Sequence, residues 1–225
     1  DATERSLSEL AQDLVKAWGD RQLTVLELED RIAQAAEKAP TEDPQIQQLR
    51  DLLQPITSLS AQFEQQIIDA NGLSIQNSSG LFQVAQPNNL RWIVAEPLPQ
   101  QVISDGVTLW LYDPDLEQVV VQAFDANIES TPAVLFSGDL DRLDTAYSIV
   151  QTSDMVFELT PEQGGSLFSS MQIVFANGAP ESIALTDGLD QVTVIRFTAL
   201  ELNPELAADL FVFEIPAGVD VIRND

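Results

Sequence analysis

Two hydrophobic periods divide the chain near residue 57. Before it, apolar side chains recur at every third or fourth position, which is typical of one face of an amphipathic helix. The first two helices end at Gly19 and Pro40, and a third opens at Asp43-Pro44, an N-cap followed by the favoured first-turn proline. The sequence predicts three helices with apolar stripes at Leu7, Leu10, Ala11, Leu14, Val15 and Trp18, at Val25, Leu28, Ile32, Ala35, Ala36 and Ala39, and at Ile46, Leu49, Leu52, Leu53 and Ile56.

From Ser58 onward the apolar residues mostly alternate with polar ones, the period of a strand with one buried face. Turn signals separate the runs, at Asn71-Gly72, Ser104-Asp105-Gly106, Asn177-Gly178, Asp187-Gly188 and Asn203-Pro204. About ten or eleven antiparallel strands at this spacing predict one large, strongly curved sheet or partial barrel. The predicted strands contain residues 59–63, 81–84, 90–94, 98–103, 107–112, 119–121, 156–159, 173–175, 183–185, 192–197 and 210–213.

The concave face of such a sheet is apolar and too wide to be closed by its own side chains. Helices, a ligand or both have to cover it. The natural covers are the third helix and a short helix at 131–137, which begins at the capped start Ser130-Thr131-Pro132 and ends before Gly138. Leu90, Trp92 and Val94 give one strand a large apolar face. Each of these residues alone fits an ordinary core, but together they favour a lipid or hydrophobic cavity.

The net charge of −26 excludes several partners. Residues 1–50 hold six basic and 11 acidic residues, whereas residues 51–225 hold four basic and 25 acidic residues. Such a surface repels nucleic acid and anionic lipid headgroups. No apolar run reaches the roughly 20 residues that span a bilayer, so we do not expect a membrane-embedded protein. Asp1 in place of Met raises the expectation of a processed, mature chain.

The residue types present argue against an enzyme. The chain has no Cys and no His, which removes thiol nucleophiles, Ser-His-Asp triads and thiolate or imidazole metal sites. Two groups of acids could serve a glycosidase or a calcium loop, but neither fits a defined motif, and both are expected to be turns or surface. They are Asp113, Asp115 and Glu117, and Asp139, Asp141 and Asp144. We expect no catalytic residues, no metal and no cofactor.

The segment from Pro87 to Gln118, PNNLRWIVAEPLPQQVISDGVTLWLYDPDLEQ, resembles the LolA family of periplasmic lipoprotein carrier proteins. Further similar stretches occur in the family's order, and the resemblance covers roughly residues 45–222. They are LSAQFEQ at 59–65, TPAVL at 131–135, FELTP at 157–161 and FEIPAGVDV at 213–221. LolB shares the fold but is anchored through a Cys, so a chain without Cys is more similar to LolA.

The resemblance implies an α+β fold, an incomplete antiparallel β-barrel with a helical lid over an apolar cavity. This carrier domain is expected at 43–225, after an N-terminal helical extension at 1–42 that the usual family pattern lacks. The resemblance also implies a set of residues that line the cavity or its lid and bind acyl chains. To these we add Trp110, because the run from Leu109 to Tyr112 is apolar on both faces; the expected set is Leu53, Leu59, Leu90, Trp92, Val94, Trp110, Pro132, Val134 and Leu135.

In some family members a basic residue holds the lid closed by hydrogen bonding, at the position that Gln86 occupies here. Gln can donate and accept but has no charge, so a weaker or different latch is expected. Arg91 is a second latch candidate, although it alternates onto the opposite face from Leu90 and Trp92.

The function that the resemblance implies is that of a periplasmic carrier in a Gram-negative bacterium. Such a carrier accepts acylated lipoproteins from an inner-membrane lipoprotein-releasing ABC transporter and delivers them to the outer-membrane receptor LolB. The alternative is a LolA-like sensor or lipid-binding module without carrier activity, for which residues 1–42 are the available partner-binding segment. A carboxylate-based hydrolase is the third hypothesis. The extension itself could stabilise the fold, plug the cavity through Trp18 or contact a partner.

Overall fold

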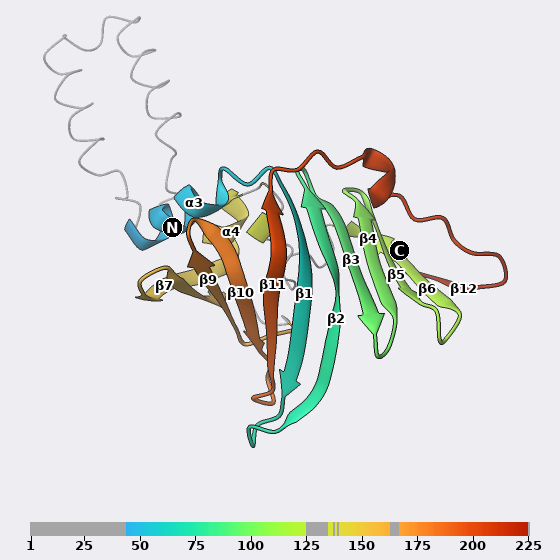
Figure 1. Ribbon diagram of the computed structural model, residues 1–225, viewed down its shortest axis with the longest axis horizontal. Coiled ribbons are helices and arrows are strands. Elements are labelled where there is room, and N and C mark those ends of the chain that lie inside the picture. The colour runs from blue at the N-terminus through green and yellow to red at the C-terminus, as the bar shows by residue number, and fades with distance from the viewer. Residues whose placement is uncertain (1–43, 125–134, 137, 139, 163–166, 225) are drawn as a thin grey trace, which may run out of the picture. The chain divides into compact units, whose positions relative to one another are not determined.

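One twelve-stranded sheet dominates the computed structural model, which describes residues 44–124, 135–136, 138, 140–162 and 167–224. The strands follow the order β12-β6-β5-β4-β3-β2-β1-β11-β10-β9-β8-β7 (Figure 1). The two end strands, β12 and β7, are not paired with each other, so the curled sheet is an incomplete barrel. The elements are α3 (Pro44–Leu53), β1 (Ser58–Ile68), β2 (Ser74–Ala85), β3 (Asn89–Glu96), β4 (Gln100–Asp105), β5 (Thr108–Asp113), β6 (Gln118–Ala123), α4 (Leu140–Ala146), β7 (Tyr147–Ser153), β8 (Val156–Pro161), β9 (Ser170–Ala176), β10 (Ala179–Thr186), β11 (Val192–Leu202), the 3₁₀ helix η4 (Ala208–Phe211) and β12 (Asp220–Asn224).

The sheet confirms the predicted fold class and corrects it in detail. Neighbouring strands are antiparallel except β12, which runs parallel to β6. The predicted strand at 210–213 is wrong, because Leu210 and Phe211 belong to η4, where Phe211 is buried by packing rather than by strand pairing. Strands β7 and β12 and helix α4 were not predicted. No turn residue separates Ala146, the end of α4, from Tyr147, the start of β7, so no local signal marks that boundary.

Helix α3 confirms the third predicted helix over its described residues. Leu49 and Leu53 are buried one turn apart on the same face, as the 3.6-residue period requires. The Gln45 side-chain carbonyl accepts a hydrogen bond from the Gln151 backbone N–H at 2.8 Å, which fixes α3 to β7. Ile56 is buried but follows the helix. The first two predicted helices, and Asp43, lie outside the described residues.

Aspartates close the hairpins at several predicted turns. Asp69, Asp105, Asp113 and Asp187 each accept hydrogen bonds from two backbone N–H groups through one carboxylate oxygen, at distances of 2.8–3.0 Å. The Leu73 backbone N–H is the main cause that lowers the pKa of Asp69 below its ordinary value. Part of the acidic content of the chain therefore has a local structural role in turn formation.

Asn203 joins the end of β11 to the connection between α3 and β1. Its side-chain oxygen accepts hydrogen bonds from the backbone N–H groups of Thr57 at 2.8 Å and Ser58 at 3.3 Å. Its amide nitrogen donates to the Pro55 carbonyl at 3.0 Å. The left-handed backbone of Asn203, with φ 55°, confirms the turn predicted at Asn203-Pro204 and redirects the chain after β11.

The sheet buries apolar residues on both faces over part of its width. Its inner face carries the main core, described below. On the outer face of β3 to β6, a smaller group is covered by the C-terminal segment that contains η4; this outer group consists of Ile103, Val119, Val121 and Phe211. Strands β5 and β6 are therefore apolar on both faces, which explains their nearly continuous apolar sequences at 109–112 and 119–121.

Gly80 lies where β2 passes close to the backbone of β3. A Cβ atom added to Gly80 would lie 1.8 Å from the Ile93 carbonyl oxygen and 2.8 Å from two ring atoms of Phe63. The pairing register of β2 and β3 also shifts between Ser79 and Gly80. Only a residue without a side chain allows this close approach.

We predict that Gly80→Ala lowers the free energy of unfolding by about 1–3 kcal/mol, because Ile93 and Phe63 have to move to admit one methyl group. Urea unfolding followed by circular dichroism measures the change. Gly188→Ala is the matched control: no atom lies within 4 Å of its added Cβ, and we expect a change below about 0.5 kcal/mol. Equal stability of the two variants would contradict this interpretation of the bend.

Candidate apolar binding site

The inner face of the sheet forms one continuous apolar cluster with its covering elements. The cluster draws on α3, the α3–β1 connection, strands β1 to β3, strands β7 to β11, helix α4 and the short segment 135–136. Its side chains next to α3 and β1 to β3 are Leu49, Leu53, Ile56, Leu59, Ala61, Phe63, Phe82, Val84, Leu90, Leu135 and Phe136. The large apolar faces of these elements, separate in sequence, are thus brought together at one place.

Phe82 is the centre of the aromatic packing in this cluster. Its ring centroid lies 5.2 Å from that of Trp92, 5.7 Å from that of Phe136 and 5.4 Å from that of Phe197. Phe63 adds a contact to Trp92 at 4.6 Å. Contacts of this kind fill the inner face with the protein's own side chains, and Phe136 comes from the region predicted to be the lid.

Most of the predicted cavity residues meet in this cluster. Leu53, Leu59, Leu90 and Leu135 are buried in it, and Trp92 and Val94 pack against it half-buried. Pro132 and Val134 lie outside the described residues. Four aromatic residues of the cluster were not among the predicted site residues, although all lie within predicted elements: Phe63, Phe82, Phe136 and Phe197. For Phe63 and Phe82, the alternation of apolar and polar residues along β1 and β2 could have predicted that they lie on the inner face.

Trp110 does not belong to the apolar cluster, and its prediction as a cavity residue is corrected. It pairs with Ile103, which pairs with Arg91, and directly paired residues share one face of a sheet. Trp110 therefore lies on the outer face, opposite to Leu90. There its ring lies 6.5 Å from that of Phe213, in the C-terminal segment. The run around Trp110 is apolar on both sides because two separate groups are buried there.

Gln86 occupies the position expected for a lid latch. Its side-chain nitrogen donates to the Ile56 carbonyl at 2.9 Å, and its backbone N–H donates to the Thr57 carbonyl at 2.9 Å. The same side chain lies directly beneath Gly138, where an added Cβ would approach its Cδ to 2.8 Å. Gln86 thus links the end of β2 to the α3–β1 connection and contacts the residue that lies two positions after Phe136.

Arg91 lies away from this latch position, so its prediction as a latch is corrected. Its guanidinium donates to the side-chain carbonyl of Gln83 at 3.1 Å, and the Gln83 amide donates to the Ser60 hydroxyl at 3.3 Å. These three residues are directly paired across β3, β2 and β1, on the face opposite to Leu90. Strand alternation, noted from the sequence, places Arg91 there.

Other kinds of site find little support in the described part of the chain. No group of three or more carboxylate, imidazole or thiol side chains there is placed to hold a metal ion. The Asp113 carboxylate accepts from the backbone N–H groups of Asp115 and Leu116, in line with its interpretation as a turn residue. Asp139 and the side chains of Asp141 and Asp144 lie outside the described residues. The helices described are too short or too polar to cross a bilayer.

A curled antiparallel sheet with a helix-covered apolar inner face defines the class of open-barrel proteins. The family model "Outer membrane lipoprotein carrier protein LolA" matches residues 54–214. The chain belongs to the LolA family.

Several relatives named outer-membrane lipoprotein carrier protein are similar over most of the chain. The protein from Chromohalobacter salexigens is 41% identical over 181 residues, which are 79% of this chain and 86% of the relative. The protein from Alcanivorax borkumensis is 39% identical, covering 76% and 84% of the two chains. That from Azotobacter vinelandii is 36% identical, covering 86% and 95%. A solved structure of a LolA superfamily protein from Nitrosomonas europaea superposes with a TM-score of 0.48 at 12% identity, covering 75% of this chain and 98% of that one.

We predict that Gln86→Met increases the binding of a fluorescent hydrophobic probe such as bis-ANS. Met keeps the length of the side chain but cannot donate to the Ile56 carbonyl. The loss of this hydrogen bond weakens the attachment of the α3–β1 connection to the end of β2 by about 1 kcal/mol, so the elements over the inner face are held less firmly. The control is Gln100→Met, because Gln100 makes only a long, exposed contact of 3.4 Å to Asp113. If Gln86→Met and Gln100→Met bind the probe equally, the hydrogen bond of Gln86 does not hold the cover.

Proposed function

We propose that this chain is a carrier that binds the acyl chains of lipoproteins on the inner face of its sheet and hands them on. The observation that supports this most strongly is the single apolar cluster formed by Leu53, Leu59, Leu90 and Leu135 with Trp92 and Val94. It lies in a chain whose family and whose relatives are named for lipoprotein carriage.

The energy of acyl burial explains why the site needs its own covering side chains. Each buried CH₂ group gains about 0.8 kcal/mol, so a long acyl chain gains roughly 10 kcal/mol before other terms. A rigid cavity with that affinity would release its cargo very slowly. Leu135 and Phe136 are themselves buried against the inner face. An acyl chain that enters has to displace such contacts, and this competition lowers the net affinity to a value that permits transfer.

The partners follow from the same proposal. The carrier accepts acylated lipoproteins from an inner-membrane lipoprotein-releasing ABC transporter and delivers them to the outer-membrane receptor LolB. Its place is the periplasm of a Gram-negative bacterium, and its role requires no catalysis. The surplus of acidic residues favours this role, because like charge keeps the protein from adhering to anionic lipid headgroups while it moves between membranes.

Native mass spectrometry of the full chain with a triacylated lipoprotein tests the proposal. We expect a one-to-one complex that loses its cargo when purified LolB is added. A complex that LolB does not empty would instead favour a sensor or lipid-binding module. Absence of any complex under conditions in which a known carrier binds the same lipoprotein would contradict acyl binding altogether.

We predict that Leu90→Glu abolishes or strongly weakens the lipoprotein complex, because it places a carboxylate in the apolar cluster, where Leu90 is 7% exposed. The complex is measured by native mass spectrometry, with circular dichroism to show that the sheet is retained. Leu116→Glu is the matched control, since Leu116 is 69% exposed on the β5–β6 turn. Normal binding by a folded Leu90→Glu variant would show that acyl chains bind elsewhere.

A further inference from the structure

The inner face changes from apolar to polar at one step along β1 and β2. On β1 the inward residues are Leu59, Ala61 and Phe63, all buried, and the next one is Gln65. On β2 the corresponding step is from Gly80 to Ser78, and Gln65 pairs directly with Ser78. Along β1 and β2 the apolar cluster therefore ends at a pair of hydrogen-bonding side chains, whereas on β11 the residue paired with Gln65 is Ile195, which belongs to the cluster. An amphiphile whose tails occupy the cluster would place its polar part here.

Strand β2 has a free edge at this same place. Its residues Ser79–Ala85 pair with β3, whereas Ser74–Ser78 extend beyond the last pair, Ser79 with Glu96. On the other side, residues 74–85 remain paired with β1. In the part of the chain that the structure describes, no strand pairs with Ser74–Ser78 on the β3 side. A free edge of this kind presents main-chain donors and acceptors to an added extended chain.

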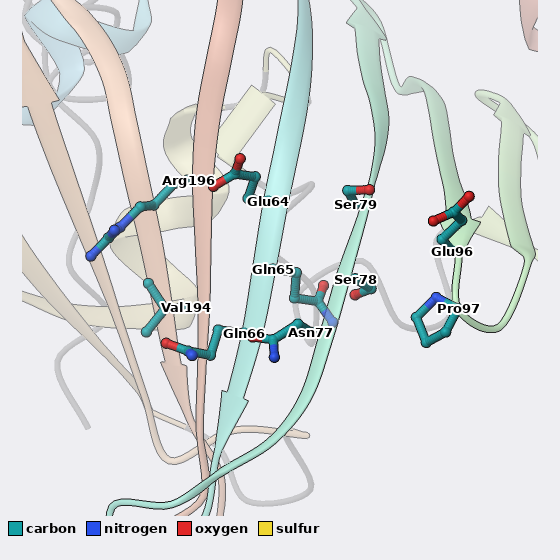
Figure 2. Close-up of a pocket in the computed structure, with 10 residues that line it drawn as sticks. All are labelled: Glu64, Gln65, Gln66, Asn77, Ser78, Ser79, Glu96, Pro97, Val194 and Arg196. Atoms are coloured by element: carbon teal, nitrogen blue, oxygen red, sulfur yellow. The ribbon is translucent and has the colours of Figure 1, made fainter.

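A hollow of about 450 Å³ spans β11, β1, β2 and the residues at the end of β3 (Figure 2). Its lining consists of Val194 and Arg196 of β11, Glu64, Gln65 and Gln66 of β1, Asn77, Ser78 and Ser79 of β2, and Glu96 and Pro97. Arg196, Glu64, Ser79 and Glu96 are directly paired from strand to strand, so most of the lining lies on the outer face of the sheet, next to the free edge of β2. We call the free edge and this hollow the β2 notch.

The buried hydroxyl of Ser78 points to a missing partner. Ser78 is 8% exposed, and its Oγ is buried without a hydrogen-bond partner. Buried polar atoms of native proteins are nearly always satisfied, by protein groups, water or a ligand. A ligand with amide groups in the β2 notch would supply that partner.

The composition of the β2 notch decides between ligand classes. Two carboxylates, of Glu64 and Glu96, and one guanidinium, of Arg196, line it, which disfavours a phosphate or another anion. None of its lining residues is aromatic, so it lacks the platform typical of sugar sites. Gln65, Gln66 and Asn77 supply amides that can pair with main-chain groups of any sequence. The chemistry fits a polypeptide backbone best.

We propose that the β2 notch holds the polypeptide that directly follows the acylated residue of a bound lipoprotein, as an extended strand beside Ser74–Ser78. This inference rests on the proposed function and adds a second subsite to it. Acyl chains on the apolar cluster have their polar ends at Gln65 and Ser78, and the next covalently attached group is the peptide backbone. Recognition through the backbone suits a carrier, because the peptides of different cargoes differ in sequence.

The absence of Cys from the chain allows a clean test with single cysteines. Asn77→Cys places a thiol in the β2 notch, and Gln172→Cys places one on the exposed face of β9 as the matched control. Each full-length variant is mixed with a synthetic triacylated lipopeptide that carries a pyridyl disulfide on the third residue after the acylated one. The rate of mixed-disulfide formation is divided by the rate with the same peptide without acyl chains. We expect a normalised rate for Asn77→Cys at least about tenfold above that for Gln172→Cys, because binding raises the local concentration of the peptide.

The outcomes separate the two proposals. Equal normalised rates, with the lipopeptide complex intact in native mass spectrometry, would overturn the notch and leave the carrier function standing. No complex with the lipopeptide would overturn both.

Ser78→Ala supplies an independent measurement. It removes an unpaired buried hydroxyl without adding volume, so the fold is expected to keep its stability. We expect the variant to bind the lipopeptide about threefold or more weakly, the loss of roughly one hydrogen bond, while its affinity for a fluorescent fatty acid stays the same. An unchanged affinity for the lipopeptide, or an equal loss for both ligands, would contradict a peptide subsite.

Discussion

The apolar inner face of the sheet is the constraint on which the rest of this protein depends. A sheet whose end strands stay unpaired cannot bury that face by closing on itself. It has to be covered by elements that come from elsewhere in the sequence, here α3, α4 and residues 135–136. Because a cover of this kind is held by side-chain packing and by a few hydrogen bonds, such as that from Gln86 to Ile56, it can be displaced without breaking the sheet. In the carrier that we propose, this open construction makes acyl binding reversible.

The outer face of the sheet has a second cover, formed by the C-terminal segment. Asn203 ties the end of β11 to the α3–β1 connection, and the chain then crosses to the outer face. There Phe211 and Phe213 pack against β3 to β6, and β12 adds a parallel strand beside β6. These contacts leave the inner cluster untouched. The sheet thus has two covers: the outer one adds a paired strand to its buried packing, whereas the inner one is held by side-chain packing and a few hydrogen bonds.

Much of this architecture could be predicted from sequence because its signals are local. Period-two alternation identified most strands, the Asp- and Gly-containing turns marked their ends, and α3 begins at the expected Pro44. Leu59, Leu90 and Trp92 share the inner face of the sheet because alternation fixes which face a residue shares with its neighbours. Trp110 was misplaced, since a run that is apolar on both sides does not reveal what covers each face. The burial of Leu210 and Phe211 without strand pairing, and the free edge of β2, depend on contacts far apart in the sequence, and no local pattern encodes them.

The acidity of the chain combines a structural and an electrostatic role. Some carboxylates are committed to turns, where Asp105 and Asp113 each hold two backbone N–H groups, so they cannot be replaced without cost to the hairpins. Residues 51–225 contain only four basic residues against 25 acidic ones, so most of the carboxylates have no basic residue to balance their charge. An acidic protein with an apolar site treats the two parts of a lipid differently. Burial favours binding of the acyl chains, whereas like charge repels the anionic headgroups of the bilayer. For a protein that has to take lipid-modified cargo without remaining on a bilayer, this difference lets affinity for the cargo rise without a matching rise in affinity for the membrane.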